Sequence, residues 1–399
     1  MQAYVIDWLS LIVRWFHLTA GIAWIGTSFY FVWLDDNLNR AVTDAERKRG
    51  IDGELWGVHG GGFYHNEKYL TGPAGEPLSN DLHWFYWEAY STWLSGMAML
   101  AIVYWAGASS FMIDTSVLAL TPPEAIGISL GSIVLGWLVY DALCRLLGRN
   151  EFALWTAIGF FLLFADWGLF HVFGPRAAFI HVGAIIGTIM VWNVFFIIIP
   201  GQRKVVAQLR AGQVPDSRPG ELARQRSVQN TYFTLPVLFI MISNHYPMTY
   251  SGPYGWLVLA GLSIAGVLVR RFYVLTHFKK IVIALPVAAM LLLAIVAWAT
   301  APRTTPLAAN AAAPAFAQVA PIVAQRCAVC HAAHPTEAGF STAPEGVLLD
   351  TPEHIAAYVA AIRAEAVASH AMPLGNLTHM TDGERATLGA WIDAGAKGP

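Results

Sequence analysis

The stretch AAFIHVGAIIGTIMVWNVFFIIIP, residues 177–200, decides the fold because it contains no Asp, Glu, Lys or Arg. An α-helix needs about 20 mostly apolar residues to cross the hydrocarbon core of a bilayer, and this stretch is long enough. The whole chain has the same character. Its 399 residues are 56% hydrophobic and only 13% charged, whereas a soluble domain carries roughly 25% charged residues. The sequence therefore predicts an integral membrane protein.

Other stretches of this kind lie on both sides of it, and together they predict an all-α, polytopic bundle of about eight transmembrane helices. The approximate bounds of the eight are 8–34, 84–106, 124–147, 151–173, 177–200, 230–248, 254–276 and 281–300. We expect a membrane domain over residues 1–300.

The remaining segments predict a loop, a linker and a second domain. The loop 35–83 contains GELWGVHGGGFYHNEKYL, whose alternation around three glycines predicts a β-hairpin. Residues 301–315 are rich in Pro, Ala and Thr, as linkers are. Residues 316–399 are more polar and predict a separate, small helical domain.

Basic residues are distributed unevenly between the loops, and this predicts an orientation. Lys and Arg gather in and beside the loops after the first, third, fifth and seventh helices, while the alternate loops hold only Arg176. By the positive-inside rule the loop 35–83 is cytoplasmic, and both termini lie on the opposite side of the membrane. No run of Lys and Arg exceeds three residues, so nothing supports nucleic-acid binding.

The C-terminal domain contains Cys327-Ala328-Val329-Cys330-His331, a CxxCH sequence. Two thiols at this spacing can form thioether bonds to one haem c, and the adjacent His331 then binds the iron. Zinc binding would need a second pair of ligands, and a thioredoxin-like site would need a βαβ context. The motif predicts one covalent haem. In bacteria this group is attached in the periplasm, the side that the charge distribution also predicts for this domain.

A sixth iron ligand is expected downstream of the motif. Met372 precedes Pro373 on a loop and is the first candidate, because His/Met ligation raises the potential of the iron. The alternatives are His370, His379 and Met380. Thr381 and Glu384 then predict the capping box of a final helix. Residues 316–397 resemble a class I cytochrome c throughout.

Ionisable residues inside the predicted membrane helices are candidates for function, because charge is costly there. Arg14, His17, Asp166 and His181 are all predicted in the half of the bundle that faces the haem domain. Most such residues are hydrogen bonders between helices, and that reading stays open for each. Glu88, near the opposite face, is the alternative, together with His83 and the hairpin.

Several stretches, in this order, resemble a known family. They are Arg14-Trp15-Phe16-His17, GIAWIGTSFYFVWLDDNL, HGGGFYHNEKY, LHWFYWEAYSTWLSG, YDALC, RAAFIHVGAIIGTIMVWNVFFIIIPGQRK and NTYFTLPVLFIMISNHYP. Together they are similar to the bacterial integral-membrane urate oxidases that are fused to cytochrome c. The resemblance covers essentially the whole chain.

The resemblance implies oxidation of urate to 5-hydroxyisourate, with water as the oxygen source and no hydrogen peroxide. Electrons would pass to the haem and then to a soluble cytochrome c or a respiratory oxidase. The location would be the bacterial inner membrane, multi-pass, with both termini and the haem domain periplasmic.

For the substrate we expect Arg14 to hold the anion, His17 or His181 to act as base and Asp166 to orient the base. If urate enters from the cytoplasm, Glu88 and the hairpin would form the site, and electrons would need a relay such as a haem b between His17 and His171 or His181. The main alternative function is an electron-transfer cytochrome c subunit of a membrane respiratory complex. A redox-gated transporter is a weaker one.

Overall fold

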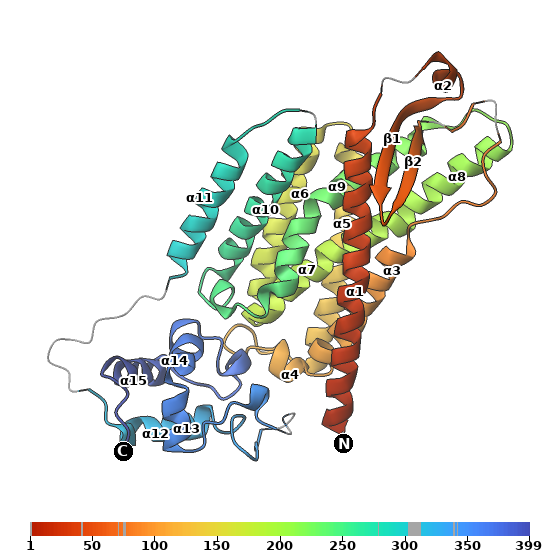
Figure 1. Cartoon of the computed structure of the whole chain (residues 1–399). Helices are drawn as coiled ribbons and strands as arrows, with labels where there is room; N and C mark the ends of the chain where they lie inside the picture. Colours follow the sequence, from red (N-terminus) through yellow and green to blue (C-terminus); the bar gives the residue numbers. More distant parts are fainter. Residues whose placement is uncertain are drawn as a thin grey trace.

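The structure is a computed structural model that describes residues 2–40, 43–70, 72–74, 77–277, 279–301, 313–337, 340 and 342–399. Long helices form a bundle, a hairpin lies at one end of it, and a small helical domain lies at the other end together with the N-terminus (Figure 1). We call these the hairpin end and the C-domain end of the bundle.

Each of the eight predicted membrane stretches corresponds to a helix in the described part of the chain. They are α1 (Gln2–Asn37), α3 (Trp87–Met99) continued by the π-helix η1 (Leu100–Trp105), α5 (Pro122–Leu147), α6 (Glu151–Phe170), α7 (Pro175–Trp192) continued by the π-helix η2 (Asn193–Ile198) and α8 (Ile199–Arg210), α9 (Ser217–Ser243), α10 (Gly255–His277) and α11 (Ala284–Ala299).

Among the described residues, five helices are long and apolar enough to cross a membrane: α1, α5, α6, α10 and the continuous helix Pro175–Arg210. The helix α11 is apolar but shorter. These helices are compatible with a membrane protein, and the number of eight spans stays a prediction.

The predicted start of one helix, at residue 230, was wrong. The helix α9 begins at Ser217, where the Asp216 side chain accepts a hydrogen bond from the Arg218 backbone at 3.0 Å and caps it. The polar first half of α9 hid this start from a search for apolar residues. Arg226 and Gln229 therefore belong to a packed helix and not to a loop.

The hairpin was predicted correctly. The strands β1 (Ile51–His59) and β2 (Gly62–Tyr69) pair antiparallel, with His59 opposite Gly62. The two residues between them, Gly60 and Gly61, both have positive φ, as the tight turn of a twisted hairpin requires. An ion pair between Lys68 and Asp35 attaches the hairpin to the end of α1.

The helices α5, α7 and α9 pack closely at the centre of the bundle. A Cβ on Gly183 would lie 2.5 Å from the Ile240 side chain, and one on Gly136 would lie 2.6 Å from Ile185. Only glycine permits these approaches, so both positions fix the distance between neighbouring helices. Two short helices at the ends of the bundle complete it, α2 (Asp44–Lys48) beside the hairpin and α4 (Ala108–Phe111) at the C-domain end, and a 3-10 turn η3 (Pro247–Thr249) precedes α10.

The C-terminal domain has its own apolar core. Its elements are α12 (Phe316–Arg326), α13 (Pro352–Ala357), α14 (Val359–Ile362), α15 (Asp382–Asp393) and the short turns η4 (Pro344–Gly346), η5 (Arg363–Ala368) and η6 (Leu374–Asn376). The predicted capping box is present, since the Thr381 hydroxyl accepts from the Glu384 backbone and the Glu384 carboxylate accepts from the Thr381 backbone. Most of the predicted linker 301–315 lies outside the described residues.

The helices α12 and α15 pack against each other in this domain. The rings of Phe316 and Trp391 lie 5.9 Å apart, and Leu388 is fully buried. Arg326 at the end of α12 donates to Glu384 of α15 at 3.0 Å. The first and last helices are thus held by both apolar contact and an ion pair.

Candidate functional site

The CxxCH residues form a turn directly after α12. The backbone N–H of Cys330 donates to the Cys327 carbonyl at 3.1 Å, and that of His331 donates to the same carbonyl at 2.9 Å. The two cysteines and the histidine therefore lie on one turn of chain. Both cysteines are free thiols. Burial raises the pKa of Cys327 to about 11 and also raises that of Cys330, so both stay protonated at neutral pH.

The His331 ring is oriented by the backbone. Its Nδ1 lies 3.0 Å from the Val347 carbonyl, and because a carbonyl only accepts, Nδ1 carries the proton. This leaves the lone pair on Nε2 for a metal. A second hydrogen bond of this kind is what usually fixes the orientation and tautomer of a metal-binding histidine.

Met372 also lies against the core that contains Cys327. Its backbone N–H donates to the backbone carbonyl of Glu365, and its own carbonyl accepts from the Arg385 guanidinium at 2.7 Å. Met380 is buried in the same core. His370 and His379 both have positive φ. The two thiols, the oriented imidazole and a thioether beside one apolar core fit a c-type haem, and the choice of Met372 over its rivals stays a prediction.

The loop that carries Met372 contacts the membrane domain. A Cβ on Gly375 would lie 3.1 Å from the Ile113 carbonyl and 3.2 Å from the Ser110 carbonyl. Gly375 also has a positive φ of 55°. The turn η6 therefore lies directly on the segment that follows η1, at the C-domain end of the bundle (Figure 1).

His181 is fully buried on α7 and lies near η1, the helix that precedes this segment. Its Nδ1 donates to the Ala177 carbonyl at 2.7 Å, and with the neutral ring its Nε2 accepts from the Ser129 hydroxyl at 2.7 Å. Ser129 in turn accepts from the Trp105 indole N–H at 2.9 Å. The ring of Tyr104 lies 6.2 Å away. His181 is thus a neutral imidazole with a basic nitrogen inside a hydrogen-bonded chain.

The other predicted site residues have separate surroundings. His17 on α1 lies 2.9 Å from the Thr92 carbonyl and 3.0 Å from the Ser95 hydroxyl, both on α3. Arg14 is exposed on α1 and has no hydrogen-bond or ion-pair partner among the described residues. Asp166 is 3% exposed, and its Oδ1 has no partner within the described chain.

No hydrogen bond joins Arg14, His17, Asp166 and His181 to one another in the described structure, so their assembly into one site stays a prediction. The alternative, Glu88, begins α3 with a buried Oε2 that no described residue contacts by a hydrogen bond. His83 packs its ring against Phe85.

Sequence reasoning missed a second buried polar cluster, toward the hairpin end, where α5, α7–η2 and α9 meet. Arg226, 2% exposed, donates to Asp141 at 2.5 Å, and Asn193 donates to the Tyr140 hydroxyl at 2.8 Å and to Asn230 at 3.0 Å. Tyr140 donates to Gln229 at 2.5 Å. We call these six residues the amide–arginine cluster: Tyr140, Asp141, Asn193, Arg226, Gln229 and Asn230.

Part of this cluster was visible in the sequence. The expected pair between Asp141 and Arg145 is present at 2.6 Å. Because the loop before α9 is predicted to extend to residue 229, Arg226 and Gln229 are predicted as loop residues. The signal that could have found them is the spacing of Arg226, Gln229 and Asn230, which puts all three on adjoining positions of one helical face. Asn193 opens a π-helix, a feature that is frequent at functional sites.

The fold and these residues define a class of protein: a helical bundle with apolar surfaces and buried polar clusters, to which a small helical domain is attached. Residues 3–301 match the family model described as urate oxidase N-terminal. The chain therefore belongs to the urate oxidase N-terminal family, and this membership indicates an oxidoreductase that acts on urate. No curated protein and no solved structure matches the chain.

Proposed function

We propose that this chain is a membrane-bound urate oxidase whose electrons leave through the C-terminal domain. Urate and water yield 5-hydroxyisourate, two protons and two electrons. Water supplies the hydroxyl oxygen, and no hydrogen peroxide forms. The family match supports urate as the substrate, and the long apolar helices support a membrane location. Within this proposal the chain is a multi-pass protein of the bacterial inner membrane.

The contact between the two domains is the observation that supports the C-terminal domain as the exit for electrons. Gly375 of the turn η6, three residues after Met372, packs on the backbone of Ser110 and Ile113. That segment follows η1, which carries Tyr104 and Trp105 beside His181. The C-terminal domain is therefore attached where buried aromatic and imidazole side chains of the bundle approach its end.

The residues of the C-terminal domain would hold a c-type haem in defined ways. Cys327 and Cys330 would form the thioethers, His331 would present Nε2 to the iron and Met372 would be the sixth ligand. The bound haem would supply a one-electron acceptor of raised potential. A soluble cytochrome c or a respiratory oxidase would then accept electrons from the exposed domain.

The placement of the chain ends supports the predicted orientation. The N-terminus and the C-terminal domain share one end of the bundle, while the hairpin and the basic helix α8 lie at the other (Figure 1). With the hairpin end cytoplasmic, both termini and the C-terminal domain are periplasmic.

Within the bundle, His181 is suited to accept a proton from urate or water, because Nε2 is already an acceptor in a fully buried position. His17 and Asp166 stay candidates for the same work. Arg14 stays the candidate for holding the anion: it is exposed and has no hydrogen-bond or ion-pair partner among the described residues, so its guanidinium is available. A haem b relay at His17 has no support from a neighbouring imidazole in the described contacts.

The proposal is tested with the purified full chain in water labelled with ¹⁸O and a soluble electron acceptor. We expect 5-hydroxyisourate with one ¹⁸O atom and no hydrogen peroxide. Product oxygen derived from O₂, with peroxide in equal amount, would show that electrons go directly to oxygen. No turnover of urate at all would contradict the function itself.

A further inference from the structure

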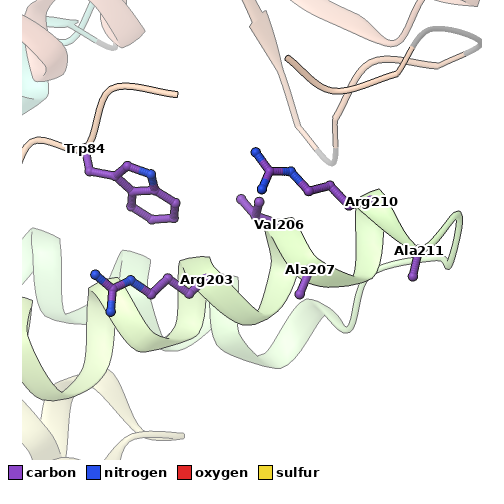
Figure 2. Close-up of a pocket in the computed structure, with 6 residues that line it drawn as sticks. All are labelled: Trp84, Arg203, Val206, Ala207, Arg210 and Ala211. Carbon is purple, nitrogen blue, oxygen red and sulfur yellow. The ribbon is translucent and has the colours of Figure 1, made fainter. Parts of the chain in front are cut away.

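A hollow at the hairpin end is lined by residues that have no proposed role so far. Its volume is about 530 Å³, and its lining residues are Trp84, Arg203, Val206, Ala207, Arg210 and Ala211. This volume falls in the range of small-molecule sites, about 300–1,000 Å³. Trp84 comes from the segment before α3, and the other five residues come from α8 and its end (Figure 2). We call this hollow the Trp84 pocket.

The pocket carries positive charge that no carboxylate of the described residues neutralises. Neither Arg203 nor Arg210 has a carboxylate within ion-pair distance among the described residues, and Arg210 reaches only the carbonyls of Ser79 and Asn80, at 3.5 and 3.4 Å. By contrast Lys204, the next residue on α8, is paired with Asp216 at 3.2 Å. Two unpaired guanidinium groups on one hollow favour an anionic ligand.

An aromatic face adjoins these cations. The Arg203 guanidinium lies 5.9 Å from the centre of the Trp84 ring, and Figure 2 shows the guanidinium groups of Arg203 and Arg210 on two sides of that ring. Trp84 also packs against the apolar cluster of Ala89, Val191, Val194 and Ile199. The indole is therefore anchored in the fold, and an indole ring is a flat surface on which a planar ligand can stack.

From this geometry we propose that the Trp84 pocket is an entry site that first binds the planar purine anion from the cytoplasmic side, separate from the buried groups proposed for proton transfer. The inference rests on the proposed function, because urate is a planar anion that can stack on an indole while two guanidinium groups bind its oxygens. The phosphate of an anionic lipid is a second source of negative charge at a membrane surface. A lipid phosphate would use the arginines but would gain nothing from the Trp84 ring.

The test is equilibrium dialysis of radiolabelled urate against the full chain in nanodiscs of neutral lipid. The variants are Trp84→Leu, Arg203→Gln and Arg210→Gln. The matched control is Lys204→Gln, which removes the same charge from the same helix outside the pocket. We expect each arginine variant to weaken urate binding about tenfold or more, as the loss of one charge-assisted hydrogen bond predicts. Trp84→Leu is expected to weaken it by a similar factor.

The steady-state KM for urate should rise by the same factors, and the absorbance spectrum of each variant should match that of the parent chain, which shows that it has folded. Urate binding and KM that are unchanged in all three variants, in a parent chain that oxidises urate, would overturn the pocket and leave the proposed function standing. A parent chain that neither binds nor oxidises urate would overturn both. Repeating the dialysis with anionic lipid measures competition. A lipid effect with no dependence on Trp84 would assign the arginines to lipid and contradict the inference.

Discussion

The two ends of the bundle differ in how their polar and charged groups are held. The C-domain end has a hydrogen-bonded chain of Trp105, Ser129 and His181, and its one arginine on α7, Arg176, donates to the Asn244 side chain at 3.2 Å. The hairpin end has charges, both in the buried pair of Arg226 and Asp141 and in the unpaired arginines of the Trp84 pocket. Charge in a low-dielectric bundle is retained where it serves binding or structure.

This difference assigns different work to the two ends. Guanidinium groups beside an indole are suited to recognise a planar anion, and imidazole and aromatic groups beside the C-terminal domain are suited to handle protons near an electron outlet. The amide–arginine cluster lies toward the hairpin end, where α5, α7–η2 and α9 meet. Its groups are largely satisfied by one another, so its first role is to fix α5, α7 and α9.

The largest expected effect is a change that abolishes haem attachment at the C-domain end and leaves urate binding at the hairpin end unchanged. Cys327→Ala should abolish stable covalent haem, because one thioether and the geometry of the turn are lost. Urate binding at the hairpin end should be unchanged, since no described residue of the Trp84 pocket belongs to the C-terminal domain. Haem staining on a denaturing gel and urate dialysis measure the two.

The matched control for this change is Cys144→Ala, which alters the third cysteine, buried in the bundle. It should keep the haem stain. A covalent haem retained at full amount in Cys327→Ala would contradict the assignment of the motif.

A second prediction concerns the buried ion pair. Arg226→Gln leaves Asp141 buried without its inner partner, and breaking such a pair is expected to lower the free energy of unfolding by about 3–5 kcal/mol. The control, Arg145→Gln, removes the other arginine on the same carboxylate, whose side chain is 69% exposed. It should change stability by about 1 kcal/mol or less. Denaturant unfolding in detergent measures the free energy of unfolding of both variants. Equal losses would show that the burial of Arg226 does not make its ion pair more important than that of Arg145.

The contact between the domains gives a smaller effect. In Gly375→Ala the new Cβ would meet the carbonyls of Ile113 and Ser110, so docking should weaken. Urate-dependent reduction of the C-terminal domain should slow by about tenfold, the factor that corresponds to roughly 1.4 kcal/mol. Stopped-flow absorbance measures the rate.

Gly346→Ala is its control, because Gly346 also has positive φ, at 70°, but open space around its Cα. It carries the same backbone strain without the contact. Equal slowing in both variants would attribute the effect to strain within the domain and not to docking.

The smallest effect is confined to the C-terminal domain. The hydrogen bond from the Thr381 backbone, with help from Arg326, lowers the pKa of Glu384. Because the folded pKa is depressed, the stabilisation is present above the ordinary glutamate pKa and is lost as the pH falls through the folded value. Glu384→Gln should cost about 1 kcal/mol at neutral pH. Thermal unfolding at pH 7 and at pH 3 should show a smaller difference between the variant and the parent chain at pH 3, and an equal difference at both would contradict the role of the charge.

Much of the architecture follows from the sequence, for physical reasons. Apolar length locates the helices, and Gly60 and Gly61 locate the hairpin turn, because both signals are local. The start of α9 at Ser217 was missed because its buried face is polar. The motif at Cys327 is likewise local, and its chemistry is predictable from five residues.

The site in the bundle is different, because its residues are brought together only by packing. Nothing in the sequence places Trp84, in the segment before α3, beside Arg203, which lies on α8 more than a hundred residues later. Equally, nothing in the sequence shows that His17 bonds to α3 while His181 bonds to Ser129 of α5. Sequence order could suggest these residues as candidates, but it could not group them.

The central claim is that electrons from urate leave through the C-terminal domain, and one measurement tests it most directly. The purified full chain is mixed with urate in the absence of oxygen while the absorbance of its haem is followed. The account predicts reduction by urate and none by xanthine or allantoin. A haem that stays oxidised with urate, yet is reduced by an external electron donor, would contradict the claim and favour an electron-transfer subunit that does not act on urate.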